Sequence, residues 1–231
     1  MNQIFKFICC GNVDDGKSTL IGRILLDTDN VTKDQLMDAK KASIQNGSKK
    51  TQLSMLLDGL ISERQQQITI DIAHRYFDYK DIRFHILDCP GHSQYTKNMA
   101  TAAAQADSAI VVIDVTKGIS EQTKKHIEIC SFFKLKNVCI CLTKCDLITD
   151  VNGIIDSKRI DNISNDINDL MKSYDFNYKI IPISSITRFN IDKVLETICL
   201  FAKESKKDSE NIKDTVIHIQ KAKIYDGERY Y

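Results

Sequence analysis

A glycine-rich segment that ends in lysine and serine carries the most specific chemistry of this sequence. It reads Gly11-Asn12-Val13-Asp14-Asp15-Gly16-Lys17-Ser18 and is followed by Thr19. Glycines let consecutive backbone N–H groups curl around a polyphosphate, and a helix that begins there adds its positive dipole end. In such a loop Lys17 reaches the β- and γ-phosphates of a nucleotide, and the Ser18 hydroxyl binds Mg²⁺. A glycine-rich turn that carries Lys-Ser by chance is the alternative.

A second group of residues fits the far end of the same ligand. Asp88 follows an apolar run, and Gly91 comes shortly after it. A carboxylate there holds Mg²⁺ through a water, and the Gly91 N–H donates to a γ-phosphate, a contact that is lost after hydrolysis. Thr69, between two isoleucines, is the candidate second hydroxyl ligand of Mg²⁺. An ordinary turn and an ordinary strand threonine are the alternatives for these positions.

His92 directly follows Gly91, where a residue that positions an attacking water would face the γ-phosphate. Phosphoryl transfer needs mainly placement and charge stabilisation, and an imidazole aimed at that water serves this purpose. The expected catalytic residues are therefore His92, Lys17, Thr69 and Gly91. A structural role is the alternative for a lone histidine.

Two short motifs that follow apolar runs predict which base is bound. They are Thr143-Lys144-Cys145-Asp146-Leu147 and Ser184-Ser185-Ile186. Asp146 accepts hydrogen bonds from the N1–H and the exocyclic amine of guanine; adenine lacks these donors and would leave the carboxylate unpaired. The Lys144 stem lies against the base plane, and the Ser185 N–H meets guanine O6. Capping serines are the alternative for the second motif, but together the two motifs predict guanine.

The elements that must position these residues are strands that end beside them. An apolar run over 4–10 precedes the glycine-rich loop, and apolar residues at helical spacing follow it over 20–25. Continuous apolar runs at 109–113 and 138–142 are typical of central parallel strands covered on both faces. The other expected elements are strands at 70–79, 82–87 and 180–183 and helices at 35–42, 53–60 and 191–202. This alternation predicts an α/β fold with a doubly wound, mostly parallel six-stranded sheet and ligands at the strand carboxyl ends.

Two local signals add detail to this sheet. Lys80-Asp81 separates two of the expected strands and predicts a hairpin turn between them. Pro182 places the strand at 180–183 at an edge or an end of the sheet, because proline donates no ladder hydrogen bond.

The C-terminal part of the chain changes character. Residues 204–214 are strongly charged and nearly free of apolar side chains, which predicts a linker. A strand is expected over 215–225, with Asp226-Gly227 as a hairpin turn. Because a lone hairpin is barely stable in water, we interpret 215–231 as the start of an incomplete second β domain and 1–203 as the first domain. A strand that packs back on the main sheet is the alternative.

The composition limits the partners and the compartment. The chain has 231 residues and a formal net charge of +1, so no general attraction to nucleic acid or to a membrane surface is expected. Its eight cysteines contain no C-x-x-C motif, and several lie inside apolar runs, which is typical of buried thiols in a reducing compartment. No apolar run approaches the roughly 18 residues of a membrane span. These features predict a cytoplasmic protein.

The motifs, in this order, resemble the translation-factor class of GTPases over residues 3–203. The resemblance implies that 1–203 is the GTP-binding domain of a P-loop NTPase and that 215–231 begins a β-barrel domain. Within that class the chain resembles the GTPase subunit (subunit 1) of heterodimeric sulfate adenylyltransferases. The stretches that carry this resemblance are 13–25, 57–60, 63–64, 68–77 and 90–101.

The resemblance also implies an activity, cofactors and a partner. It implies Mg²⁺-dependent binding and hydrolysis of GTP, with GDP as the product. Hydrolysis would be coupled to the synthesis of adenosine 5′-phosphosulfate by a catalytic small subunit. A translation-factor-like switch that gates binding to a macromolecular partner is the alternative, because both functions use the same nucleotide machinery.

Four positions depart from the pattern of that family. Gln67 stands where glycine is usual, which removes easy access to positive φ and predicts that the switch opens differently. Thr143 stands where asparagine is usual, so one side-chain tether between the base-binding loop and the phosphate loop is expected to change. Cys89 stands where a small threonine or alanine is usual, which is expected to be harmless, and Ser185 replaces alanine but keeps its backbone donor.

Overall fold

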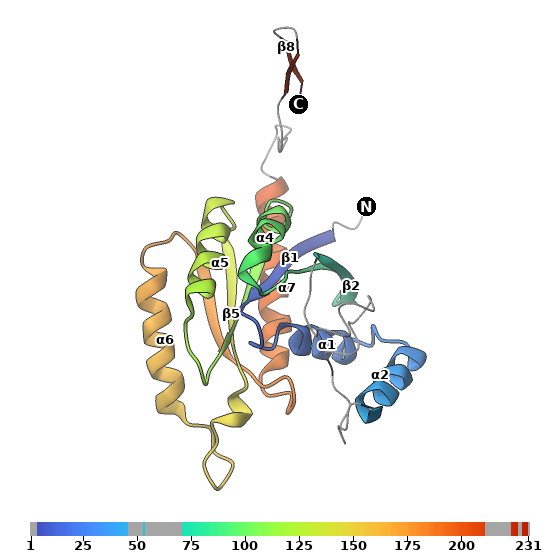
Figure 1. The fold of residues 1–231 in the computed structure, drawn as a ribbon, viewed down its shortest axis with the longest axis vertical. Helices are drawn as coiled ribbons and strands as arrows, with labels where there is room; N and C mark the ends of the chain where they lie inside the picture. The colour runs from blue at the N-terminus through green and yellow to red at the C-terminus, as the bar shows by residue number, and fades with distance from the viewer. Residues whose placement is uncertain (1–3, 46–52, 54–70, 211–222, 226–227, 231) are drawn as a thin grey trace.

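Six strands form one sheet in the computed structural model, which describes residues 4–45, 53, 71–210, 223–225 and 228–230 (Figure 1). The strands are β1 (Ile4–Gly11), β2 (Ala73–Tyr79), β3 (Ile82–Asp88), β4 (Ser108–Asp114), β5 (Asn137–Thr143) and β6 (Asn177–Pro182). Their spatial order is β2-β3-β1-β4-β5-β6, and every neighbouring pair is parallel except β2 with β3. This confirms the predicted mostly parallel, six-stranded sheet.

The strand order explains where a ligand is expected. The chain begins at β1 in the middle of the sheet, adds β3 on one side and then moves to β4 on the other. In open α/β sheets, ligands bind at the carboxyl ends of strands where the order reverses. The carboxyl end of β1 is such a point, and the glycine-rich loop begins there.

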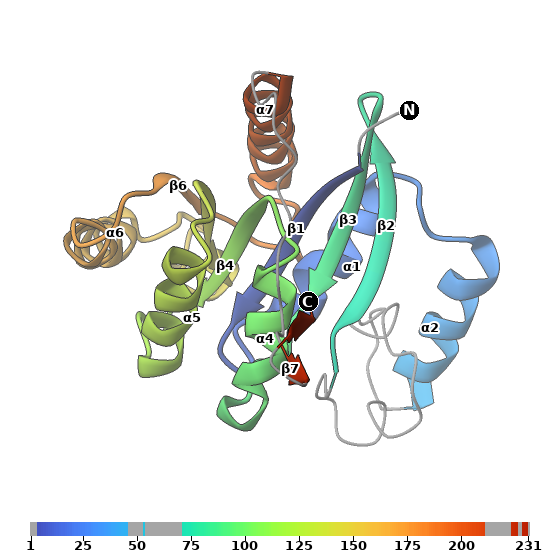
Figure 2. The same cartoon turned by 90° about the horizontal axis from the view of Figure 1, so that it is seen from above.

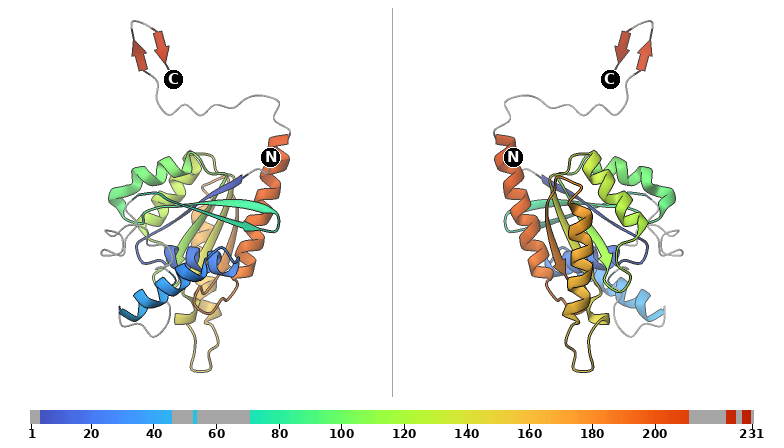
Figure 3. Two further views of the ribbon diagram at one scale, coloured as in Figure 1. Left: turned by 90° about the vertical axis from the view of Figure 1, so that its right-hand side faces the viewer. Right: turned by 90° about the vertical axis from the view of Figure 1, so that its left-hand side faces the viewer.

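Helices cover both faces of the sheet (Figures 2 and 3). They are α1 (Lys17–Asp27), α2 (Lys33–Gln45), α4 (Thr96–Ala103), α5 (Glu121–Phe132), α6 (Ser157–Met171) and α7 (Ile191–Glu210), with two 3₁₀ turns, η2 (Ser93–Tyr95) and η3 (Cys145–Leu147). Helices α1 and α7 pack on one face, and α4, α5 and α6 pack on the other. No described helix combines the length and the hydropathy that crossing a bilayer requires.

The alternation of side chains along β1 shows how the two layers form. Phe7 points into the core under α1 and α7, whereas Ile8 points into the core under α4, α5 and α6. Every residue of β4 and of β5 is buried, as expected for central strands covered on both faces. The core therefore holds the carboxyl ends of β1, β4 and β5 in fixed positions beside one another.

Most predicted elements are present. The hairpin between β2 and β3 is confirmed, and both of its turn residues, Lys80 and Asp81, have positive φ, as a type I′ turn requires. The strand that carries Pro182 is β6, at one edge of the sheet, as predicted. The helix expected at 35–42 is α2. The helix expected at 53–60 lies outside the described residues apart from Leu53.

The charged segment 204–214 differs from its prediction. Helix α7 continues to Glu210, so the first part of the predicted linker is helical. A helix that is already nucleated by a packed apolar face extends at little cost through residues such as lysine and glutamate, which favour helix. Further on, β7 (Lys223–Tyr225) and β8 (Glu228–Tyr230) pair antiparallel, as expected for this hairpin, whereas the rest of the expected strand, 215–222, and the turn residues 226–227 lie outside the described residues. They form a two-stranded sheet of their own and do not extend the main sheet.

Candidate functional site

The glycine-rich loop connects the end of β1 to the start of α1. Its backbone has positive φ at Gly11 (153°), Asp14 (63°) and Gly16 (97°). A Cβ on Gly11 would collide with the Val112 carbonyl oxygen of the neighbouring strand β4, so glycine is required there. Gly16 is the left-handed residue directly before α1, and its carbonyl accepts the Leu20 N–H at 2.9 Å. The loop therefore turns the chain directly from the strand into the helix.

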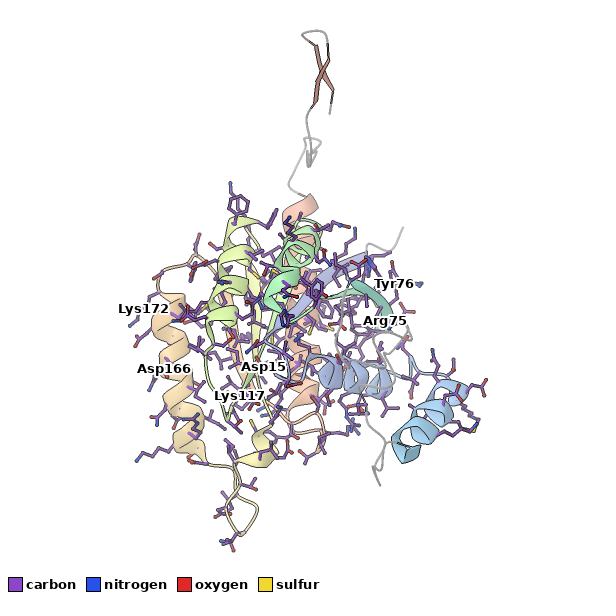
Figure 4. All side chains as sticks on the ribbon, viewed as in Figure 1. Asp15, Arg75, Tyr76, Lys117, Asp166 and Lys172 are labelled. Atoms are coloured by element: carbon purple, nitrogen blue, oxygen red, sulfur yellow. The ribbon has the colours of Figure 1, made fainter. Side chains whose placement is uncertain are left out.

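Hydrogen bonds inside the loop hold it in a closed curve. The Asn12 N–H donates to Asp15 Oδ2 at 3.0 Å, and the Val13 N–H donates to Asn12 Oδ1 at 2.9 Å. Asp15 is buried, and this burial raises the pKa of its carboxyl group although the Asn12 hydrogen bond acts in the opposite direction. Lys117, which Figure 4 labels beside Asp15, also favours the ionised carboxylate.

Lys17 and Gly91 lie against each other although they are far apart in the sequence. Lys17 Nζ donates to the Gly11 carbonyl at 3.1 Å and to the Asn12 carbonyl at 2.7 Å, and the residue is only 7% exposed. A Cβ on Gly91 would lie 2.5 Å from Lys17 Nζ and 2.9 Å from the Val13 backbone nitrogen. The fold therefore brings the two predicted phosphate-binding segments into contact, and only glycine fits at position 91.

The predicted metal ligands partly fall within the described residues. Ser18 lies in the first turn of α1, and Asp88 is buried at the end of β3, in register with Cys9 of the strand that leads into the loop. Thr69 lies outside the described residues, as does Gln67. A hydroxyl and a carboxylate are hard oxygen donors, which fits Mg²⁺ with further ligands from phosphate and water. Among the described residues, no group of three or more His, Cys, Asp or Glu side chains forms a metal site.

His92 follows Gly91 and is exposed. Its Nδ1 accepts the Gln94 N–H at 3.4 Å, and its ring lies edge-on to Tyr95 with centroids 6.2 Å apart. In a neutral imidazole whose Nδ1 accepts, the proton is on Nε2. The structure thus ties His92 to its own turn, η2, and its catalytic role stays a prediction.

Thr143 joins the glycine-rich loop to the loop that carries the predicted base-binding residues. Its hydroxyl, buried at the end of β5, contacts the Asp15 carbonyl at 2.5 Å and the Ile113 carbonyl at 3.2 Å. The sequence predicts that this tether changes when threonine replaces asparagine. In the structure the tether is present, because the shorter hydroxyl reaches the Asp15 carbonyl directly.

Lys144 is held by an aspartate that the sequence analysis missed. Lys144 Nζ donates to Asp114 Oδ2 at 2.8 Å, and the Thr116 N–H and hydroxyl donate to Asp114 Oδ1 at 2.8 and 2.6 Å. Burial alone would raise the pKa of Asp114, but the hydrogen bonds from Lys144 and Thr116 outweigh it and lower this pKa. The sequence did contain one indication that Asp114 lies at the site: like Asp88, it is the last residue of an apolar strand.

The two base-binding motifs meet in the fold. Asp146 in η3 accepts a hydrogen bond from the Ser184 hydroxyl at 2.5 Å, and the same hydroxyl oxygen accepts the Thr187 N–H at 3.1 Å. Ser184 is therefore both a local turn residue and a partner of Asp146, and the role of this motif in base binding stays a prediction. Ser185 is buried beside it.

The remaining motif residues lie at the rim of this group. Leu147 is 64% exposed and Ile186 is 52% exposed. Both are apolar side chains next to polar partners of the expected base, which is a common arrangement in ligand pockets.

Comparison with known proteins agrees with this geometry. The family model of the elongation factor Tu GTP binding domain matches residues 2–204. The chain is 40% identical over 192 residues to sulfate adenylyltransferase subunit 1 of Colwellia psychrerythraea, covering 82% of this chain and 40% of that protein. It is 48% identical over 150 residues to sulfate adenylyltransferase subunit 1 of Francisella tularensis subsp. novicida, covering 63% of this chain and 32% of that protein. The chain thus spans less than half the length of these relatives.

Solved structures show the same fold. A bacterial selenocysteine-specific elongation factor, EF-Sec, superposes with a TM-score of 0.65 at 24% identity, over 87% of this chain and 29% of that one. The S. cerevisiae Ski7 GTPase-like domain superposes with a TM-score of 0.71 at 18% identity, over 92% of this chain and 51% of that one. With the family model matching most of its length, the chain belongs to the family of the elongation factor Tu GTP binding domain.

Proposed function

We propose that this chain binds GTP and hydrolyses it with Mg²⁺, as the GTP-binding domain of a sulfate adenylyltransferase GTPase subunit. One observation carries the proposal: the Thr143 hydroxyl bonds to the Asp15 carbonyl and so joins the phosphate loop to the loop that holds Asp146. A phosphate cradle and a purine-selecting carboxylate are therefore held at a fixed spacing, as a purine nucleoside triphosphate requires. The relatives named sulfate adenylyltransferase subunit 1 support the assignment to sulfate activation.

The phosphate end of GTP would be bound by the loop and by Gly91. Lys17 would exchange its contacts with the Gly11 and Asn12 carbonyls for the β- and γ-phosphates, and the loop N–H groups would donate to the same oxygens. The residues assigned to the nucleotide are Asn12, Val13, Asp14, Asp15, Gly16, Lys17, Ser18, Thr19, Thr143, Lys144, Asp146, Leu147, Ser184, Ser185 and Ile186. Because Gly91 contacts Lys17, the segment after β3 would respond directly to the presence of a γ-phosphate.

The metal ion would be held by Ser18 and Thr69, with Asp88 bound through a water. Bound Mg²⁺ would neutralise charge that develops on the phosphate oxygens. His92, exposed beside Gly91, would hold the attacking water. Turnover of the chain alone is expected to be slow, on the order of 10⁻⁴ to 10⁻² s⁻¹, as for unassisted GTPases.

The partner and the rest of the protein belong to the same proposal. GTP hydrolysis would drive the synthesis of adenosine 5′-phosphosulfate by a small catalytic subunit. Residues 1–203 would be the GTP-binding domain, and the β7–β8 hairpin would open a β-barrel domain. The eight free, buried cysteines support a reducing compartment, the cytoplasm.

The test is calorimetric titration of the chain with GTP, GDP and ATP, with and without Mg²⁺. We expect GTP and GDP to bind, ATP to bind far more weakly, and Mg²⁺ to strengthen GTP binding. Tighter binding of ATP, or no heat from GTP or GDP, would contradict the proposal. Co-purification with ribosomes or tRNA, in place of an adenylyltransferase subunit, would leave the nucleotide site intact but overturn the assignment to sulfate activation.

A further inference from the structure

Arg23 extends from α1 to the loop that holds the guanine motif. Its Nε donates to the Ser185 carbonyl at 2.7 Å, and its Nη2 donates to the Ile186 carbonyl at 3.4 Å. The Arg23 side chain is only 14% exposed. A guanidinium offers several N–H groups in a rigid planar fork, so one side chain holds two successive carbonyls in a defined orientation.

Asp27 orients Arg23 from the other side. One turn further along α1, its Oδ1 accepts from Arg23 Nη1 at 3.3 Å, and its Oδ2 accepts from Arg188 Nε at 3.0 Å. The Asp27 side chain is 6% exposed. The carboxylate thus ties Arg23 to a residue at the far end of the same loop, and Arg188 itself has a positive φ of 67°. Both ends of 185–188 are therefore anchored to α1.

These contacts continue to the carboxylate that is expected to select the base. The described peptide bonds include no cis bond, and in a trans peptide the C=O and N–H groups point in opposite directions. Arg23 holds the Ile186 carbonyl, so the Thr187 N–H of the same peptide points away from Arg23, toward Ser184 Oγ at 3.1 Å. The Ser184 hydroxyl then donates to Asp146 Oδ1 at 2.5 Å. A continuous set of hydrogen bonds therefore runs from Arg23 to Asp146.

We infer that Arg23 is a positioning residue for base selection, acting on Asp146 through the Ile186–Thr187 peptide and the Ser184 hydroxyl. The inference rests on the proposed function, because it assumes that Asp146 binds guanine. A carboxylate selects guanine only if its oxygens face the N1–H and the amine at hydrogen-bonding distance. Fixing one oxygen with the Ser184 hydroxyl fixes the direction of the carboxylate, and Arg23 fixes the loop that carries Ser184.

A purely structural role for Arg23 makes a different prediction. If Arg23 only stabilised the fold, its loss would weaken the binding of every purine nucleotide by the same factor. If it positions Asp146, its loss reduces the contribution of the exocyclic amine in particular. Inosine 5′-triphosphate (ITP) lacks that amine but keeps N1–H and O6. The ratio of the ITP and GTP dissociation constants therefore separates the two roles.

The experiment compares this ratio in the unmodified chain and in Arg23→Met, measured by competition with a fluorescent guanine nucleotide. Loss of a charge-assisted hydrogen bond commonly changes binding by about tenfold or more, so we expect the ITP/GTP ratio to fall by about tenfold in Arg23→Met. Arg23→Lys keeps the charge but loses the planar guanidinium that binds both carbonyls. We expect its ITP/GTP ratio to lie between those of the unmodified chain and Arg23→Met. An unchanged ratio in a folded Arg23→Met variant would overturn the inference.

Arg159 supplies a matched control. From α6, its Nε and Nη2 donate to the Val115 and Thr116 carbonyls at 3.1 and 3.0 Å, the same fork on two successive carbonyls of a different loop. Arg159→Met is expected to lower the melting temperature but to leave the ITP/GTP ratio unchanged. A similar fall in both variants would show a general effect of stability and would also overturn the inference.

Asp27→Asn keeps the inference testable if Arg23→Met does not fold. It preserves the shape of the side chain and weakens the hold on Arg23, so the ratio is expected to fall by a smaller factor. An unchanged ratio in a folded Asp27→Asn variant would then overturn the inference. If the unmodified chain itself does not prefer GTP to ATP, the proposed function fails, which is distinct from the failure of the Arg23 inference alone.

Discussion

Three aspartates at or just beyond the carboxyl ends of β3, β4 and β5 differ in their surroundings. Asp88 is buried at the end of β3, where the proposed function places Mg²⁺. Asp114 at the end of β4 binds Lys144, and Asp146 just beyond β5 binds Ser184. Their sequence positions are alike, but Asp114 and Asp146 bind different side chains. The contacts that an aspartate makes at this edge of the sheet therefore depend on the individual residues around it.

Asp146→Asn tests the base-selecting carboxylate. The amide presents a donor where guanine offers its amine but xanthine offers an oxygen, so preference should shift from guanosine to xanthosine nucleotides. We expect GTP affinity to fall by at least about 100-fold, because a site built for hydrogen-bond donors rejects ligands that mismatch it. Dissociation constants for GTP and xanthosine triphosphate measure the change.

Asp150→Asn is the matched control for that substitution. Asp150 accepts the Asn152 and Ile154 N–H groups at 2.8 Å in the adjoining loop and touches no base-motif residue in the described contacts. It should leave the preference for GTP unchanged. Unaltered GTP affinity in Asp146→Asn would show that this carboxylate does not bind the base.

His92→Ala tests the proposed water-positioning residue. Because His92 is exposed and its described contacts stay within its own turn, its loss should leave GTP affinity nearly normal. Single-turnover hydrolysis should slow by about tenfold, which corresponds to about 1.4 kcal/mol of transition-state stabilisation. His74→Ala, at an exposed histidine of β2, is the control. Equal hydrolysis rates in His92→Ala and the unmodified chain would show that His92 does not position the water and has only a structural role.

At the scale of elements, the sheet places several loops near one another, and single side chains then join these loops by hydrogen bonds. Thr143 at the end of β5 contacts the phosphate loop, and Arg23 of α1 contacts the loop after β6. α7 differs, because its charged end beyond residue 203 continues as helix to Glu210. The contacts between these loops therefore depend on single polar side chains at the ends of elements.

Thr143→Val tests the connection between the phosphate and base loops. Valine keeps the volume of threonine but removes the hydroxyl that contacts the Asp15 carbonyl. Leaving a buried carbonyl without that donor costs about 1–3 kcal/mol, so we expect GDP affinity to fall by about tenfold. Titration with GDP measures it, and Thr143→Asn, which keeps a donor, should remain close to the unmodified chain. Equal affinity in the valine variant would show that the tether does not contribute to binding.

At the scale of the whole molecule, the strand order decides where the site forms. β1 lies between β3 and β4, so the glycine-rich loop, the segment after β3 and the loop after β5 meet at one edge of the sheet. The same arrangement buries Asp114, whose side chain is 2% exposed, and pairs it with Lys144, whose side chain is 30% exposed. Under the proposed function, stability and ligand binding would therefore share Lys144.

Asp114→Asn tests the contribution of the Asp114 carboxylate through the pH dependence of stability. The pKa of Asp114 is lowered in the folded chain, so its contribution is present at neutral pH and is lost as the pH falls below the ordinary value of 3.8. We expect the nucleotide-free variant to lose about 1–2 kcal/mol in the free energy of unfolding at pH 7. The difference from the unmodified chain should shrink in acid. Urea denaturation at several pH values measures it.

Glu121→Gln is the control for the pH experiment. Glu121 pairs with Lys124 at 2.7 Å on the surface, with its side chain 81% exposed. No resolvable change in unfolding free energy is expected from its loss, because solvent screens exposed ion pairs. A difference between Asp114→Asn and the unmodified chain that stays constant with pH would contradict the role assigned to the Asp114 carboxylate.

The sequence by itself determined the strand–helix alternation, the phosphate loop and the base motifs, because these depend on residue type and on short spacing. It did not reveal that Thr143 reaches Asp15, 128 positions away, or that Arg23 reaches Ser185, 162 positions away. Such contacts depend on which strands become neighbours and on how each loop leaves the sheet. Local periodicity carries no information on either, so only the tertiary structure decided how the site is held together.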